Sequence, residues 1–209
     1  MFFLQDQVAM LKGLLALFEA TQDEALLRRA QALAGFLQTR FADGQGLYLA
    51  RAGSTEGLPA AGRRPVDDNL LLARTFLRLE AFSGEEAWRD RARGIAAKLC
   101  TPAGLDAQGR WLGEAILLLA ELKEEAPHLV VTGTQADPRT QKLMAAARRV
   151  WAPGLARLRH DPALGAPLNP QLSFPALEQP AAFLCGNGTC SKPLLTEEDL
   201  QAEMKRRRR

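Results

Sequence analysis

Residues 15–20 have the sequence LALFEA, and residues 76–81 repeat it in altered form as FLRLEA. Downstream of each lies a second matching segment, RAQAL at 29–33 and RARGI at 91–95. Apolar residues in these stretches recur every three or four positions, which is the spacing of an amphipathic helix. A helix pair repeated at a period of roughly 60 residues is typical of a helical array or toroid. One such pair cannot bury its apolar face alone, so we expect neighbouring pairs to cover it.

The same apolar spacing predicts five helices in the first part of the chain. They cover residues 5–19, segments that begin near 23, 67 and 86, and residues 111–122. Either Asp67 or Asp68 is expected to cap the third helix, because aspartate at this position accepts hydrogen bonds from free backbone N–H groups. The fifth helix has no obvious sixth to pair with. We therefore predict that residues 1–125 form a partial (α/α) toroid of helical hairpins.

Residues 126–209 have a different pattern. A short apolar run at 129–131 predicts a strand, and Asp137 followed by Pro138 predicts the start of a helix. A second strand at 155–159 would complete a parallel β-α-β unit. Residues 181–185 predict a third strand, and a short helix from Thr196 leads into a basic tail. The fold class expected for the whole chain is mainly α, with a small α/β segment at its end.

The charge distribution argues against nucleic acid as a partner. The net charge is +3, yet residues 205–209, KRRRR, alone carry five positive charges, so the rest of the chain is slightly acidic. We interpret this tail as a solvated segment. No apolar run approaches the ~20 residues that span a bilayer, and residues 1–6 do not resemble a secretory leader. We therefore expect a cytoplasmic protein that does not enter a membrane, and no motif indicates a cofactor.

The segment from Cys185 to Cys190 is the sharpest local feature. Its centre, Asn187-Gly188, favours a tight turn that brings the two sulfurs near each other. Our preferred interpretation is a structural turn with two semi-buried thiols that stay reduced in the cytoplasm, and three cysteines do not make a disulfide framework. A redox or disulfide pair and half of a metal site are the alternatives. The two histidines lack the spacing of zinc ligands, so no metal is expected.

Other candidate sites have simple structural explanations. Paired carboxylates can cleave a glycoside, and Asp6, Asp67 and Asp68 are the candidates for catalysis, but all three fit helix capping as well. The turn at residues 131–134 lacks a phosphate-binding motif, so we interpret it as a plain strand-to-helix connection. The tryptophans at helical apolar positions are expected in the core: Trp88, Trp111 and Trp151.

Several segments, in this order, resemble one known family. They are LALFEAT at 15–21, DNLLLAR at 68–74, VVTG at 130–133 with Asp137-Pro138, WAPG at 151–154, and residues 182–190 with Pro193. Together they resemble the C-terminal portion of the thioredoxin-domain-containing family related to spermatogenesis-associated protein. The resemblance covers nearly the whole chain.

The resemblance implies a larger protein in three parts. A thioredoxin-like domain precedes an (α/α) toroid similar to N-acylglucosamine 2-epimerases and six-hairpin glycosidases, and a small α/β segment follows. The thioredoxin-like part has no counterpart here, so its redox cysteines cannot be transferred; Cys185 and Cys190 are the pair that matches the family pattern. We expect a chain without complete catalytic activity that self-associates or docks with a chain carrying the missing toroid half. A sugar-active epimerase- or glycosidase-like enzyme and a thiol-redox protein are the alternatives.

Overall fold

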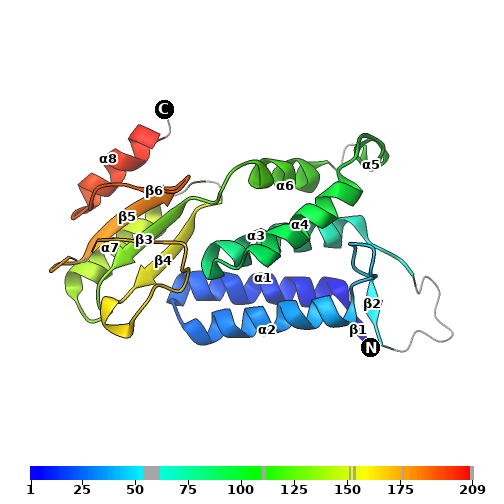
Figure 1. The fold of residues 1–209 in the computed structure, drawn as a ribbon, viewed down its shortest axis with the longest axis horizontal. Coiled ribbons are helices and arrows are strands. Elements are labelled where there is room, and N and C mark those ends of the chain that lie inside the picture. Colours follow the sequence, from blue (N-terminus) through cyan, green and yellow to red (C-terminus); the bar gives the residue numbers. More distant parts are fainter. Residues whose placement is uncertain (54–61, 110–111, 151, 153, 176, 208–209) are drawn as a thin grey trace. The chain divides into compact units, whose positions relative to one another are not determined.

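The computed structural model describes residues 1–53, 62–109, 112–150, 152, 154–175 and 177–207. Their contacts divide the chain into two compact units (Figure 1). The first unit consists of Met1–Glu80 and Glu85–Glu124, and the second of Ala81–Gly84 and Glu125–Arg209. Among the described residues, none of the helices is both long and apolar enough to cross a membrane.

The first unit is built from helices. A small antiparallel pair of strands, β1 (Phe2–Phe3) and β2 (Arg51–Ala52), lies beside them. The helices are α1 (Leu4–Thr21), α2 (Glu24–Arg40), α3 (Val66–Ser83), α4 (Glu86–Leu99), α5 (Pro102–Gln108) and α6 (Gly113–Lys123). The structure confirms a mainly α chain with hairpins of helices, while a toroid remains a prediction.

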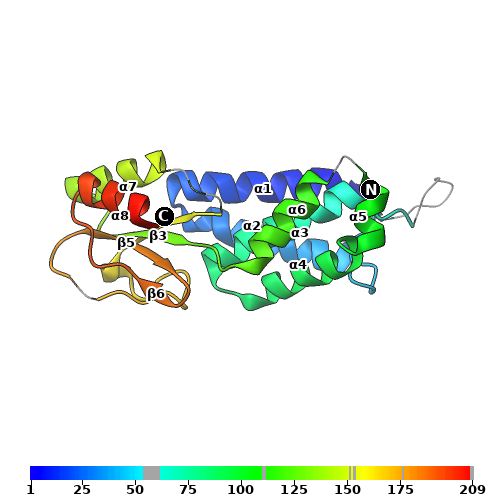
Figure 2. The same ribbon diagram turned by 90° about the horizontal axis from the view of Figure 1, so that it is seen from above.

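The α1–α2 hairpin follows from local sequence signals. The buried side chains of α1 are spaced three or four residues apart, so they form one apolar face. Gln22 ends the helix in the left-handed conformation, with φ of 60°, and its N–H donates to the Phe18 carbonyl. Asp23 then caps α2 by accepting a hydrogen bond from the Ala25 N–H at 2.9 Å. The two helices lie side by side in both views (Figures 1 and 2).

Ion pairs connect α3 with the helices on either side of it. Arg78 of α3 pairs with Glu19 of α1 at 2.5 Å. Arg74, one helical turn earlier, pairs with Glu114 and Glu121 of α6 at 2.5 and 2.7 Å. All five side chains are partly exposed, so we expect these pairs to orient the helices more than they stabilise them.

Two expectations for the first unit need correction. Residues 102–108 form helix α5 where no helix was expected, because Pro102 suits the first helical position and the Thr101 hydroxyl accepts a hydrogen bond from the Gly104 N–H at 3.1 Å. Asp67 and Asp68 do not cap α3. The helix begins one residue earlier, at Val66, since the Pro65 carbonyl already accepts a hydrogen bond from the Asn69 N–H at 3.2 Å.

The second unit contains a four-stranded mixed sheet with the order β4-β3-β5-β6. Its strands are β3 (His128–Thr132), β4 (Ala156–His160), β5 (Ala181–Gly186) and β6 (Thr189–Cys190). Strands β3 and β4 are parallel and connected through α7 (Pro138–Arg149), which confirms the expected β-α-β unit. As expected, Asp137 caps α7 by accepting a hydrogen bond from the Arg139 N–H at 2.7 Å. Strand β5 pairs antiparallel with the other edge of β3.

The two faces of this sheet have different covers. Helices α7 and α8 (Glu197–Arg207) lie on one face (Figure 2) and enclose an apolar core with Leu129, Val131 and Leu184. On the other face, Phe183 and Cys185 contact Phe174 of the long loop that follows β4. Alternate residues of β5 therefore point into two separate apolar clusters, as a strand covered on both sides requires.

Candidate functional site

Strands β5 and β6 form the hairpin that carries the two cysteines. The turn residues Asn187 and Gly188 both have positive φ, 51° and 71°, as a two-residue hairpin of this type requires. This turn pairs Cys185 directly with Cys190, and their Cα atoms are 4.0 Å apart. The predicted turn therefore brings the two sulfurs together.

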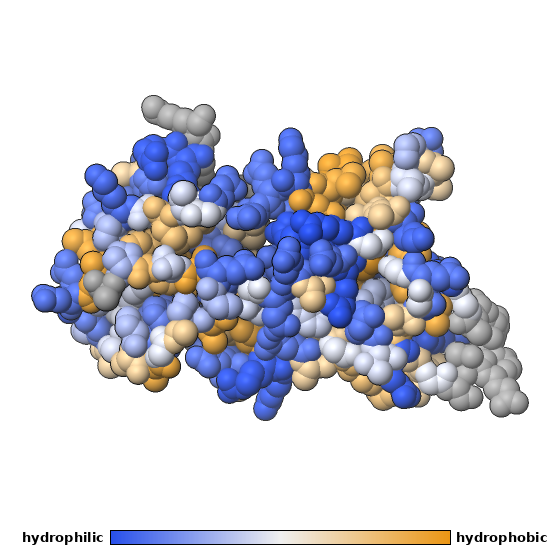
Figure 3. Space-filling model, viewed as in Figure 1, coloured by the Kyte–Doolittle hydropathy of each residue, from blue (hydrophilic) through white to orange (hydrophobic). Residues whose placement is uncertain are grey.

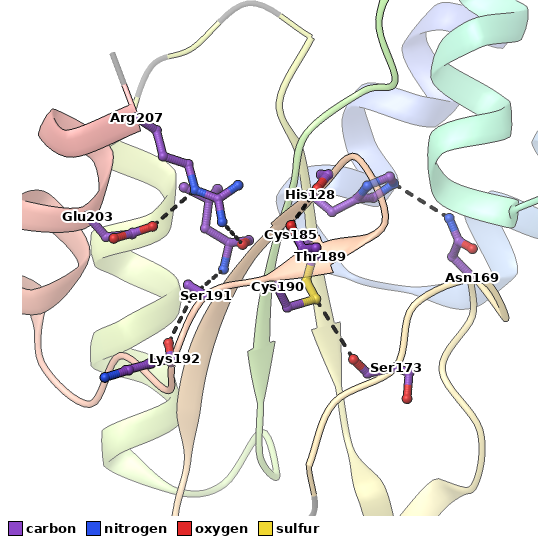
Figure 4. The surroundings of a disulfide bond; sticks show 12 residues. His128, Asn169, Ser173, Cys185, Thr189, Cys190, Ser191, Lys192, Glu203 and Arg207 are labelled. Carbon is purple, nitrogen blue, oxygen red and sulfur yellow. Dashed lines mark hydrogen bonds and ion pairs between the residues drawn. A yellow bond between two sulfur atoms is a disulfide. The ribbon is translucent and has the colours of Figure 1, made fainter. Parts of the chain in front are cut away.

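Cys185 and Cys190 are joined by a disulfide (Figure 4). This differs from our preferred interpretation of two reduced thiols and corresponds to the disulfide alternative. That interpretation rested on an expected reducing compartment and on the number of cysteines. The pairing depends instead on register, which places the two residues opposite each other on neighbouring strands. Cys185 is buried and Cys190 is exposed, so solvent reaches the bond from the Cys190 side. The third cysteine, Cys100, is free and half-buried, and burial raises the pKa of its thiol.

Hydrogen bonds between side chains and the backbone of Leu184 hold the base of this hairpin. The Leu184 N–H donates to the Ser191 hydroxyl at 3.1 Å, and the Arg207 guanidinium donates to the Leu184 carbonyl at 2.7 Å (Figure 4). Cys190 Sγ lies 3.8 Å from the Ser173 carbonyl oxygen. In the disulfide this sulfur carries no hydrogen, so the contact becomes a hydrogen bond only after reduction.

Part of the basic tail is paired with a carboxylate. Arg206 and Arg207 both donate to Glu203, at 2.6–2.8 Å and 3.0 Å, and lower the pKa of Glu203 to about 2. Lys205, Arg206 and Arg207 are exposed, as expected of a solvated tail, although two of them also pair with Glu203. Arg208 and Arg209 lie outside the described residues.

The two histidines have separate surroundings. His128 Nε2 lies 2.7 Å from the Ala81 carbonyl oxygen, while the His160 ring packs against Phe174 with 6.0 Å between ring centroids. Burial lowers the pKa of His160. Within the described part of the chain, no three His, Cys, Asp or Glu side chains are grouped so that they could hold a metal ion.

Asp67 and Asp68 lie in the first turn of α3, where negative charge suits the helix dipole. Burial raises the pKa of Asp68, and the neighbouring Asp67 carboxylate adds to the effect. Adjacent residues on a helix do not face each other. The two carboxylates therefore do not converge on one point, as glycoside cleavage requires, and the sugar-active alternative gains no support from them. Asp6 lies in the first turn of α1, not at its cap.

The residue that organises this region is Asn69, which sequence reasoning did not single out. Its side chain is fully buried and makes three hydrogen bonds. The amide oxygen accepts from the Tyr48 N–H at 2.8 Å, and the amide nitrogen donates to the carbonyls of Tyr48 at 2.9 Å and Pro65 at 2.8 Å. The sequence did contain a signal for a buried polar residue here. Asn69 comes directly after two exposed or half-buried aspartates and begins a buried helical run.

Helix α6 exposes a large apolar surface. Its buried face consists of Ala115 and Leu118, whereas Ile116, Leu117 and Leu119 are 58%, 46% and 42% exposed. Figure 3 shows apolar atoms gathered over α6. We call these three residues the α6 surface.

Helix α1 also has an exposed apolar face. Met10 and Leu17 are 59% and 54% exposed and lie two helical turns apart. The exposed positions between them are the small residues Gly13 and Ala16 and the cation Lys12.

The structure tests the expected burial of the tryptophans in the core at one residue, Trp88. Trp88 is buried and stacks on Phe76, with 5.4 Å between ring centroids, which confirms its place in the core. Trp111 and Trp151 lie outside the described residues.

The sequence is similar to spermatogenesis-associated protein 20 of Homo sapiens, with 26% identity over 208 residues that cover 92% of this chain. The protein of the same name from Mus musculus is 24% identical over the same share of the chain. In both cases the chain spans about a quarter of the relative's length, 26%. No protein-family model matches the chain. The chain is therefore a homologue, at low identity, of spermatogenesis-associated protein 20 over 92% of its length.

Proposed function

We propose that this chain is the C-terminal part of a thioredoxin-domain-containing protein, and that its helical hairpins dock against further hairpins of an (α/α) toroid. In this role the chain completes an assembly and has no complete catalytic site of its own. The similarity to relatives about four times as long supports a larger assembly. The exposed α6 surface is the observation that carries the docking role.

The physical argument rests on the cost of leaving α6 partly uncovered. Fully burying a leucine or isoleucine side chain stabilises a complex by roughly 1.5–3 kcal/mol. The three side chains of the α6 surface would therefore contribute several kcal/mol if a second helix covered them. A contiguous exposed apolar patch of this kind is typical of an interaction site. The expected occupant is an amphipathic helix of a neighbouring hairpin, since Ile116 and Leu119 are three residues apart on one side of α6 and Leu117 borders them.

Light scattering coupled to size exclusion tests the docking role. Without its natural cover, the α6 surface should drive concentration-dependent self-association of the isolated chain. Leu117→Glu should shift the chain towards monomer. Leu164→Glu is the matched control, because Leu164 is also an exposed leucine, 74% exposed, but lies far along the sequence in the α/β unit. A stable monomer over a wide concentration range, or equal effects of the two substitutions, would contradict the proposal.

The disulfide supports a second candidate, a thiol-disulfide switch at the β5–β6 hairpin. A thiolate of an external dithiol would attack the exposed Cys190 Sγ, and Cys185 would leave as a thiolate. The second thiol of the reductant then releases Cys190, so that two cysteine thiols form and the dithiol becomes a disulfide.

Counting thiols in the folded chain tests this switch. We expect one reactive thiol, Cys100, before treatment with a dithiol and three afterwards. Cys185→Ser should leave Cys190 as a permanently titratable thiol. Three thiols in the untreated, air-equilibrated chain would contradict the switch.

A further inference from the structure

The first unit also contains a cavity, which has no part in the docking role. This cavity of about 530 Å³ opens between the end of α2, the loop at residues 42–48 and one face of α4. This volume lies within the range of small-molecule sites. The loop wall contains Gly44 and Gly46, and the α4 wall contains Gly94. Because glycine has no side chain, these positions leave the interior of the cavity open.

The loop that forms one wall is rigidly held. Asp43 Oδ1 accepts hydrogen bonds from the N–H groups of Gln45 at 2.7 Å and Leu47 at 3.0 Å, and Arg64 donates to the other carboxylate oxygen. Gly44 and Gly46 have φ of 75° and 98°, values that favour glycine. The cavity wall is therefore formed before any ligand arrives.

Arg91 is fixed in the cavity but lacks a counter-charge. Its Nε donates to Gln38 Oε1 at 3.0 Å and its Nη1 to the Ala87 carbonyl at 2.8 Å. The guanidinium also lies over the Trp88 ring, 4.8 Å from the ring centroid. Among the residues that the structure describes, no carboxylate forms an ion pair with Arg91, and Nη2 makes no hydrogen bond. An arginine held in this way presents its remaining N–H groups without losing side-chain freedom on binding.

Neighbouring charges leave the cavity positive. Asp90, which lines the cavity, pairs with Arg93 at 2.9 Å, and Asp43 of the adjoining loop pairs with Arg64. A second cation lies close by: Lys98 Cε would be 3.9 Å from a Cβ atom placed on Gly46. Arg91 and Lys98 thus supply positive charge that no acidic side chain lining the cavity balances.

We infer that this cavity binds a small molecule through a carboxylate or phosphate group, and that Arg91 is the residue that anchors this group. Arginine recognises both oxyanions through paired N–H donors. The Tyr48 hydroxyl supports the anchor: it donates to Gln38 Oε1 at 2.6 Å, the same oxygen that holds Arg91 Nε. Tyr48 and Gln38 are therefore positioning residues for Arg91.

An NMR titration of the ¹⁵N-labelled chain tests this inference, with inorganic phosphate in one arm and acetate in the other, each against chloride at equal ionic strength. We expect saturable shifts of the amides of Gly44, Gly46 and Gly94 in at least one arm, which also identifies the preferred oxyanion. Arg91→Gln should weaken binding by about tenfold or more. Arg93→Gln is the matched control, because Arg93 is an exposed arginine on the same helix, and it should keep the affinity within about threefold.

A second variant separates loss of binding from loss of folding. Gly94 lines the cavity, and a Cβ atom at this position would meet no heavy atom within 4 Å. Gly94→Leu should therefore fold, since leucine is the better helix former, and should fill the cavity so that binding is lost with Arg91 intact. Absence of saturable shifts in both arms, unchanged affinity in either Arg91→Gln or Gly94→Leu, or shifts confined to other parts of the chain would overturn the inference.

Discussion

Replacement of Asn69 by alanine should be among the most destabilising single changes in the first unit. The Asn69 side chain is fully buried and connects the first turn of α3 to the backbone of Tyr48. Alanine removes all three hydrogen bonds at once. It leaves the Tyr48 N–H without its acceptor and the Tyr48 carbonyl without the Asn69 donor, whereas the Pro65 carbonyl keeps the hydrogen bond from the backbone N–H of residue 69.

The expected loss follows from these three contacts. Each hydrogen bond contributes a net of about 1 kcal/mol, and a buried donor left without an acceptor costs about 1–3 kcal/mol. The contacts are 2.8–2.9 Å long, so none is a marginal interaction. We therefore expect the free energy of unfolding to fall by about 3 kcal/mol. With a urea dependence of about 2 kcal/mol per M, the midpoint should fall by roughly 1.5 M.

Urea unfolding followed by far-ultraviolet circular dichroism measures the global effect. Hydrogen exchange of the Tyr48 amide, whose N–H is bonded to Asn69, measures the local one. The matched control is Asp67→Ala, in the same turn of α3 but exposed, which should cost less than about 1 kcal/mol. If Asn69→Ala costs no more than Asp67→Ala, or if exchange of the Tyr48 amide is unchanged, the reasoning is refuted.

Three further tests address other parts of the fold. Burial raises the pKa of Tyr48 to about 12 from an ordinary 10.0, so the ultraviolet absorbance of this single tyrosine should titrate near pH 12. The free energy of unfolding should fall between about pH 10 and 12, because the unfolded chain releases a proton that the folded chain retains. Gly84→Ala should lower the melting temperature, since φ is 72° and the new Cβ would lie 2.5 Å from Asn169 Oδ1. Gly35→Ala should raise the melting temperature slightly, because the new Cβ would meet no heavy atom within 4 Å and alanine is the better helix former. Asp137→Ala should remove the cap of α7 and lower the midpoint of thermal or urea unfolding.

Local signals were sufficient for most of the secondary structure. Apolar spacing located α1 and α2, and the aspartates Asp23 and Asp137 marked the starts of their helices correctly. The run at 129–131 and the Asn187-Gly188 dipeptide predicted β3 and the hairpin turn. Helix α5 was missed because it is only seven residues long and buries no side chain, so it has no apolar period to detect.

The candidate sites were harder to predict, because their parts are distant in sequence. Asn69 and Tyr48 are 21 residues apart, and Gln38 and Arg91 are 53 apart. Neither pair belongs to a motif, and each residue on its own resembles an ordinary polar side chain. The carboxylates proposed for catalysis were visible in the sequence, but their directions were not.

The sequence by itself determined the helical period, the strand and helix pattern of the β-α-β unit and the turn between the two cysteines, because each depends on residues within a few positions of one another. Only the tertiary structure decided that Cys185 lies opposite Cys190, that the α6 surface has no cover in the described part of the chain, and that Arg91 faces a cavity without a counter-charge. The physical reason is that pairing, burial and charge balance are properties of neighbours in space, and folding selects those neighbours from the whole chain.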